Sequence, residues 1–123
     1  MIQELYKTKN VVISTIIYTI ANGNCTERKV VDGAGNIVSH NQYEFETRVL
    51  KGYPDWNFKE CYTFYGKANK NLCSKRKDLV YNTTQDYTYD LDTGGYVVKR
   101  YVHYTDASLN TNDWDNEYVY HTY

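Results

Sequence analysis

The chain has 123 residues and a formal charge of −1, enough length for one domain with its own core. A net charge so close to zero argues against a protein whose whole surface is positively charged to bind nucleic acid. Tyrosine supplies 15 residues, and aromatic side chains favour strands, so we expect one β-rich domain over residues 1–123. The three cysteines lack metal-binding spacing and leave one thiol unpaired, which favours free thiols, a reducing compartment and a cytoplasmic location.

The first part of the chain alternates between β-forming runs and turns. Residues 1–10 are polar and predict a frayed end or a short edge strand. Val11–Ile20 is rich in β-branched residues with apolar groups on both faces, which predicts a central strand. At ten residues it is too short to span a membrane. A short strand over Thr26–Val31 and a hairpin loop at Asp32–Asn36 follow. Ile37–Leu50 alternates apolar and charged residues, which predicts a long strand with one face in water.

The middle of the chain fits two secondary structures. A helix over 55–65 would place apolar side chains on one side at spacings of three and four. A strand over 60–65 leaves no clean alternation, and the sequence favours the helix. A basic loop over 66–77, with five cations and no acid, comes next. A strand around Leu79–Thr83 is expected after it.

Residues 86–105 contain the strongest hairpin pattern. Two runs of alternating β-formers flank Asp92–Gly95, the composition of a tight loop. The expected pairs are Leu91 with Tyr96, Tyr89 with Val98 and Tyr87 with Arg100, with Tyr89, Leu91, Tyr96 and Val98 buried. A polar loop over Ala107–Asn116 and a last strand over Glu117–Tyr123 complete the chain.

These elements predict a mainly β fold, an antiparallel sheet of six or seven strands with at most one short helix around 55–65. A curved sheet, a sandwich and an open barrel all fit the pattern. The segments Asp32-Gly-Ala-Gly-Asn-Ile-Val and Asp92-Thr-Gly-Gly-Tyr-Val-Val are alike. Their loops resemble the Asp-x-x-Gly-Asn turns of the tyrosine–aspartate repeat proteins. The resemblance covers only these loops, and we transfer no activity or site from that family.

Histidines on the last strands offer one possible chemistry. If the last strand pairs with the strand that ends near Thr105, His121 lies opposite Tyr101 and diagonal to His103, with Lys99 on the same face. Two imidazoles, an ammonium and a phenol are groups that can act in metal-free acid–base catalysis, for instance on a phosphodiester. No acid is expected beside either ring.

The basic loop offers a second chemistry. Cations beside aromatic rings can contact a phosphate backbone and stack on bases, as in nucleotide and single-stranded nucleic-acid binders. The candidate residues are Tyr62, Tyr65, Lys67, Lys70, Lys75, Arg76 and Lys77. The alternative is a solvated loop, or one neutralised by the acidic C-terminal third of this chain or of a second copy.

Aromatic residues also build protein-binding surfaces, because a rigid ring gives contact area at little entropic cost. Further candidates are Lys99, Tyr101, His103, Trp114, His121 and Tyr123. We therefore predict a non-catalytic binding or inhibitory protein that uses a Tyr-rich β surface against a protein partner, as a viral or mobile-element protein that blocks a host factor would.

The alternatives are a nucleotide or single-stranded nucleic-acid binder and a small metal-free phosphodiesterase. We expect no cofactor and no membrane contact, and a homo-oligomer is compatible with the sequence. We expect no metal either, since the acids around Asp90–Asp92 lack the third ligand and the distal Glu of a calcium loop.

Overall fold

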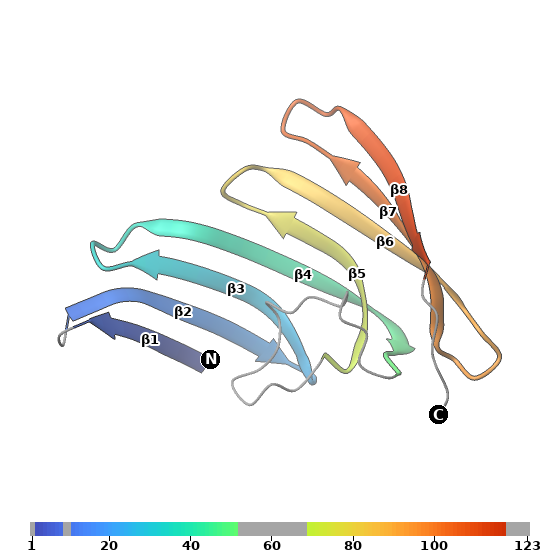
Figure 1. Ribbon diagram of the computed structural model, residues 1–123, viewed down its shortest axis with the longest axis horizontal. Coiled ribbons are helices and arrows are strands. Elements are labelled where there is room, and N and C mark those ends of the chain that lie inside the picture. The colour runs from blue at the N-terminus through green and yellow to red at the C-terminus, as the bar shows by residue number, and fades with distance from the viewer. Residues whose placement is uncertain (1, 9–10, 52–68, 118–123) are drawn as a thin grey trace.

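The computed structural model describes residues 2–8, 11–51 and 69–117, which form eight strands and no helix. The strands are β1 (Ile2–Thr8), β2 (Val11–Ala21), β3 (Asn24–Asp32), β4 (Ile37–Val49), β5 (Asn71–Asp78), β6 (Thr83–Leu91), β7 (Val97–Thr105) and β8 (Thr111–Glu117). Each strand pairs antiparallel with the next, so the order in the sheet is the order in the chain (Figure 1). The predicted antiparallel β fold is confirmed. Ile2–Thr8, expected as a frayed end or an edge, forms the first strand.

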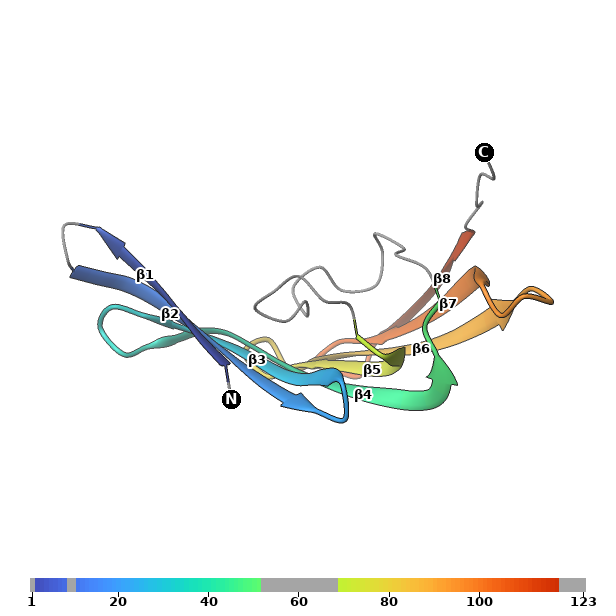
Figure 2. The ribbon, with the colours of Figure 1, turned by 90° about the horizontal axis from the view of Figure 1, so that it is seen from below.

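The sheet is a single curved layer that does not close into a barrel (Figure 2). Five of the seven strand pairs contain a register shift, and only β5–β6 and β7–β8 pair without one. A bulge bends its strand and increases the local twist. The bulges therefore help to explain why a meander of eight strands is curved rather than flat.

The structure corrects the middle of the chain in two places. Asn71–Asp78 is strand β5, so the described part of the expected basic loop is a strand in the interior of the sheet. The expected strand at Leu79–Thr83 is mainly the turn that joins β5 to β6. Cations fit an interior strand here because its neighbours supply acids, with Glu44 and Asp86 opposite Lys75. The helix expected over 55–65 lies outside the described residues.

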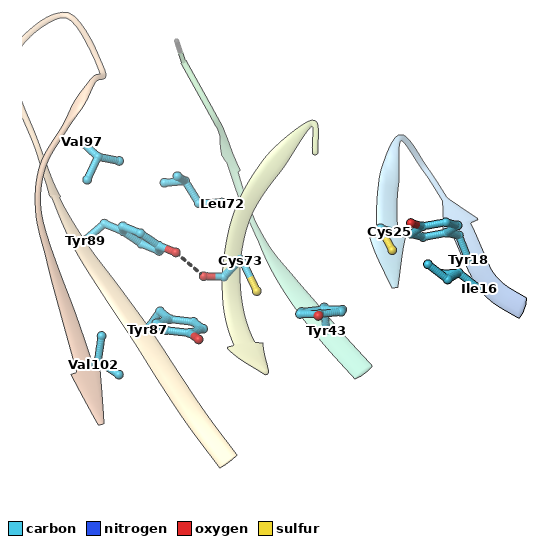
Figure 3. Close-up of a cluster of buried hydrophobic side chains, with 10 residues drawn as sticks. All are labelled: Ile16, Tyr18, Cys25, Tyr43, Leu72, Cys73, Tyr87, Tyr89, Val97 and Val102. Carbon is cyan, nitrogen blue, oxygen red and sulfur yellow. Dashed lines mark hydrogen bonds between the residues drawn. The ribbon is translucent and has the colours of Figure 1, made fainter. Parts of the chain in front are cut away.

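Buried side chains gather on one face of the sheet, which we call the aromatic face. Its core includes Ile16, Tyr18, Cys25, Tyr43, Cys73, Tyr87, Tyr89 and Val102 (Figure 3). Tyr43 on β4 lies between the side chains from β2–β3 and those from β5–β7. The buried hydroxyl of Tyr89 donates a hydrogen bond of 2.6 Å to the backbone oxygen of Cys73, so this polar group has a partner inside the core. Burial raises the pKa of Tyr89. Cys25 and Cys73 are buried, and their Sγ atoms donate hydrogen bonds of 3.4 Å to the backbone oxygen of Glu27 and 3.3 Å to that of Lys75.

The hairpin predicted over 86–105 is confirmed as β6–β7, but its predicted pairs are wrong, since Tyr89 pairs with Arg100 and Tyr87 pairs with Val102. The predicted buried face is wrong in part. Gly95 adopts a φ of 85°, and the register then shifts, so that Val97 pairs with Leu91 while Lys99 pairs with Asp90. This bulge turns Val97 inward, where it is 1% exposed, and leaves Tyr96 41% exposed. Tyr96, expected in the core, is therefore on the surface.

Three hairpin tips share one hydrogen-bond pattern: Asp32–Asn36, Asp92–Tyr96 and Asp106–Asn110. In each, the aspartate carboxylate accepts 2.9 Å hydrogen bonds from the backbone N–H groups two and four residues later. The residue three positions after each aspartate has a positive φ, and it is Gly35, Gly95 or Leu109. The sequence pairs the first two loops but misses the third, because leucine occupies the glycine position.

This third tip also corrects the end of the fold. Thr111–Glu117 is strand β8, whereas the sequence predicts a loop over Ala107–Asn116 and a strand over Glu117–Tyr123. Apart from Thr111 and Trp114, the residues of β8 are Asp, Asn and Glu, which carry little strand propensity of their own. They pair with β7 along their whole length because the Asp106 tip reverses the chain beside that strand.

Asparagines hold the start of β5 against the β2–β3 turn. Asn24 accepts a hydrogen bond of 2.9 Å from the backbone N–H of Asn71 and donates one of 3.0 Å to its side-chain oxygen. Asn69, which is buried, accepts a 2.8 Å bond from the backbone N–H of Cys25. Lys70 lies exposed between these two and donates its backbone N–H to Gly23. These contacts fix where β5 begins.

Candidate functional site

The face opposite the aromatic face carries most of the charged side chains, and we call it the charged face. One cross-strand row runs over five neighbouring strands in the order Glu44, Lys75, Asp86, His103 and Asp113. The Lys75 ammonium lies 3.5 Å from the Asp86 carboxylate. Nδ1 of His103 lies 2.5 Å from the Asp113 carboxylate. Acidic side chains therefore alternate with Lys75 and His103 along the row, so no two acids are direct cross-strand neighbours in it.

A second group on this face surrounds Tyr101. The Tyr101 hydroxyl donates a 2.7 Å hydrogen bond to Asp90, and this bond raises the pKa of the phenol. The Lys99 ammonium lies 5.3 Å from the centre of the Tyr101 ring and 3.6 Å from Asp115. Asp115 raises the pKa of Lys99, with a smaller contribution from Glu117 at 3.7 Å. Lys99 and Tyr101 are thus already engaged by neighbouring side chains.

An open depression of about 400 Å³ lies over β6–β8, lined by residues that include Asp86, Thr88, Tyr101, His103, Asp113 and Asp115. Its titratable groups are mostly acids. In the part of the chain that the structure describes, no three His, Cys, Asp or Glu side chains are grouped closely enough to hold a metal ion. The depression therefore offers one chemical feature, the imidazole of His103 in contact with the carboxylate of Asp113.

The structure places five of the sequence-predicted residues on the charged face: Lys75, Lys77, Lys99, Tyr101 and His103. Asp113 beside His103 corrects the expectation that no acid lies near that ring, which followed from assigning Asp113 to a loop. Tyr62, Tyr65, Lys67, His121 and Tyr123 lie outside the described residues.

Trp114 projects from the opposite, aromatic face. Its ring centre lies 6.1 Å from that of Tyr104, at an interplanar angle of 38°. Trp114 is still 39% exposed, because β8 is at the edge of the sheet.

The cations of β5 do not form one patch. Because side chains alternate along a strand, Lys75 and Lys77 lie on the charged face while Arg76 lies on the aromatic face. Arg76 donates a 3.2 Å hydrogen bond to the buried Asn41. A phosphate backbone crossing the charged face would meet Lys77 and the Lys75–Asp86 pair rather than the run of cations that the sequence displays.

Exposed apolar side chains gather at three hairpin tips, which the sequence does not single out. The connections β3–β4, β5–β6 and β7–β8 lie one after another along the same end of the sheet (Figure 1). We call their exposed large apolar residues the tip surface; they are Ile37, Val38, Leu79, Val80, Tyr81 and Leu109. Tyr81 is 71% exposed and Leu109 is 80% exposed.

The backbone at Tyr81 and Leu109, the two most exposed members of the tip surface, is fixed by hydrogen bonds to aspartate carboxylates. The Asp78 carboxylate accepts hydrogen bonds of 3.0 and 3.1 Å from the backbone N–H groups of Val80 and Tyr81. Leu109 has a φ of 65°, a conformation that costs a residue with a side chain about 1–2 kcal/mol. A leucine in place of the glycine of an Asp-x-x-Gly loop is the sequence signal that points to this tip.

Comparison of the chain with protein-family models, curated proteins and solved structures finds no match. Function is therefore argued from the arrangement of the side chains. Within residues 2–8, 11–51 and 69–117, no helix is long and apolar enough to cross a membrane.

Proposed function

We propose that the protein is a non-catalytic binding or inhibitory module that docks a protein partner on its β surface. The observation that carries this proposal is the tip surface, where Tyr81 and Leu109 are exposed on neighbouring hairpins. Large apolar side chains in water contribute nothing to folding, and Leu109 adds backbone strain. Leu109 therefore exposes apolar surface to water and also strains the backbone, and both costs are compatible with a side chain that contacts another molecule.

The braced hairpins suit this role. Backbone N–H groups fixed by Asp78 and Asp106 hold the tips in one conformation, so little loop entropy is lost on docking. Tyrosine and leucine anchors fit apolar pockets of a protein more readily than the phosphates of a nucleic acid. An odd number of cysteines without metal-binding spacing supports action in the reducing cytoplasm.

A paired substitution tests the proposal. Tyr81→Ser with Leu109→Gly removes both anchors, while the glycine relieves the strained φ, so the variant stays folded and Leu109→Gly by itself raises stability. Tagged wild-type protein should retain a partner from the native host that the double variant loses. Val49→Ser is the matched control, because Val49 is 53% exposed but lies at the far end of β4. Equal retention by the double variant, or equal loss by the control, would contradict the proposal.

A second candidate function, acid–base catalysis, is favoured by the His103–Asp113 contact of 2.5 Å within the β6–β8 depression. A carboxylate on Nδ1 orients an imidazole and stabilises its protonated form, as a general base requires. Turnover of a chromogenic phosphodiester that is lost in His103→Asn would support this candidate. Absence of turnover across pH 5–9 would remove it.

A further inference from the structure

Among the described residues, strand β8 is an edge strand that has no bulge, proline or lysine. It lies last in the sheet order, and it pairs with β7 from Lys99–Glu117 to Thr105–Thr111 with no register shift. Natural edge strands are commonly protected by bulges, proline or charged side chains, especially lysine. Thr111–Glu117 contains no proline and no lysine, and its charged side chains are all acidic, so they disfavour an acidic or identical strand but not a basic one. The edge strand β1, in contrast, has a bulge beside Lys7. The backbone of β8 is thus regular enough to pair with another strand.

The two faces beside this edge differ in chemistry. Asp113, Asp115 and Glu117 lie on the charged face, and they are 75%, 49% and 76% exposed. Among the described basic side chains, Lys99 contacts Asp115 and Glu117, and the His103 ring contacts Asp113. The aromatic face carries Trp114, flanked by Asn112 and Asn116. A strand added here would meet three acids on one side and an indole ring on the other.

We propose that β8 accepts an extended segment of a partner protein as an additional strand, and that this segment alternates lysine or arginine with apolar residues. Backbone hydrogen bonds along β8 supply the pairing, as in other complexes formed by strand addition. The basic side chains lie beside Asp113, Asp115 and Glu117, and the apolar ones pack against Trp114. This surface is separate from the tip surface and does not depend on it.

Charge complementarity excludes a second copy of this chain as the occupant. Antiparallel pairing of β8 with another β8 keeps the acids of both copies on one face, and like charges on neighbouring strands are destabilising. Pairing of β8 with β1 of another copy would bring Gln3 and Leu5, neither of which is a cation, to the charged face beside the acids. It would also be a heterologous contact, which repeats head to tail into a ring or an open filament. A basic strand from a different protein satisfies both faces.

The test uses the full chain and a fluorescent nine-residue peptide that alternates lysine and valine. Fluorescence anisotropy at low salt should show saturable binding that weakens as salt rises, and an acidic peptide of alternating glutamate and valine should not bind. Hydrogen exchange of the β8 amides should slow when the basic peptide is present. No saturable binding of the basic peptide, or equal binding of the acidic one, would overturn the proposal.

Backbone methylation separates strand addition from simple charge attraction. Two further peptides carry N-methyl groups on either all lysine or all valine amides, because alternate N–H groups point to opposite edges of a strand. At least one of them should bind ten or more times more weakly than the parent peptide. Unchanged binding of both would contradict pairing with β8 and leave only a charged surface.

Protein variants locate the site. Asp115→Asn with Glu117→Gln should weaken binding about fivefold, from two exposed ion pairs. Glu44→Gln with Glu46→Gln changes the net charge equally on β4 and should leave affinity within twofold of wild type. Tyr81→Ser with Leu109→Gly should bind the peptide normally. Failure of peptide binding would therefore reject strand addition and leave the proposal for the tip surface unchanged. Self-association of the chain that the peptide disrupts would contradict the proposal and identify a second copy as the occupant of β8.

Discussion

The two halves of the charged face share one sheet but differ in what they carry. Over β1–β4 one cross-strand row reads Leu5, Thr15, Val31 and Ile37, while the contact between Glu27 and His40 lies farther along the same strands. Over β4–β8 a row reads Glu44, Lys75, Asp86, His103 and Asp113. The aromatic face and the hairpin tips, in contrast, have similar character in both halves. The comparison indicates that the aromatic face and the turns specify the fold. The charged face tolerates either apolar or ionic pairs, so substitutions there should cost little.

The largest expected effect is on the aromatic face. Tyr89→Ala should lower the free energy of unfolding by about 3–5 kcal/mol, the range for removing a buried aromatic side chain. Tyr89→Phe removes only the hydrogen bond to Cys73 and should cost about 1–2 kcal/mol. Urea denaturation followed by circular dichroism measures both. Leu5→Ala, at a position 52% exposed on the other face, is the control, and a loss as large as that of Tyr89→Ala would break the comparison.

The next effect concerns the positive-φ positions of the tips. Gly95→Ala places a side chain at a φ of 85° and should destabilise by about 1–2 kcal/mol, while Leu109→Gly should stabilise by less, since glycine also gains entropy in the unfolded chain. Thermal unfolding midpoints that move in opposite directions would support the account. A lower midpoint for Leu109→Gly would mean that the leucine serves folding rather than contact.

A smaller effect is the pH dependence that comes from Glu27. A hydrogen bond with His40, 2.9 Å away, lowers the pKa of Glu27 below 4.5. A depressed pKa in the folded state gives a stabilisation that is fully present above pH 4.5 and is lost as the pH falls through the folded value. Stability curves should therefore fall less steeply below pH 4.5 in Glu27→Gln than in wild type. Parallel curves would show that this pair does not contribute.

The smallest effect is expected from the exposed ion pairs. Lys75→Met should change the free energy of unfolding by less than about 1 kcal/mol, because exposed pairs are screened. Raising the salt concentration should shrink the difference further. A loss of several kcal/mol in denaturant titrations would show instead that the ionic row specifies the fold of the C-terminal half.

The sequence predicts strand identity best where apolar and polar residues alternate. The hairpin over 86–105 follows from its alternation, but its register depends on a bulge after Gly95 that no pattern of hydrophobicity records. The sequence does not predict the strand Thr111–Glu117, because its polar residues pair only when β7 is already in place. The sequence predicts a loop at β5, because the acids that neutralise its cations, Glu44 and Asp86, lie on the separate strands β4 and β6.

The candidate sites follow the same division. Lys99, Tyr101 and His103 were placed on one face because their spacing of two along one strand suffices. Asp113 beside His103 depends on strand pairing, so it could not be anticipated. The tip surface depends on three turns meeting at one end of the sheet, which is a property of the topology rather than of any short sequence.

The most direct test of the central claim, that the tip surface contacts a protein partner, is site-specific photo-crosslinking in the native host. A photoreactive amino acid is placed at position 81, at position 109 and, as a control, at position 49. The account predicts the same discrete adduct from 81 and 109 and none from 49, since only the first two lie on neighbouring tips. No adduct from the tips, or the same adduct from all three positions, would contradict it.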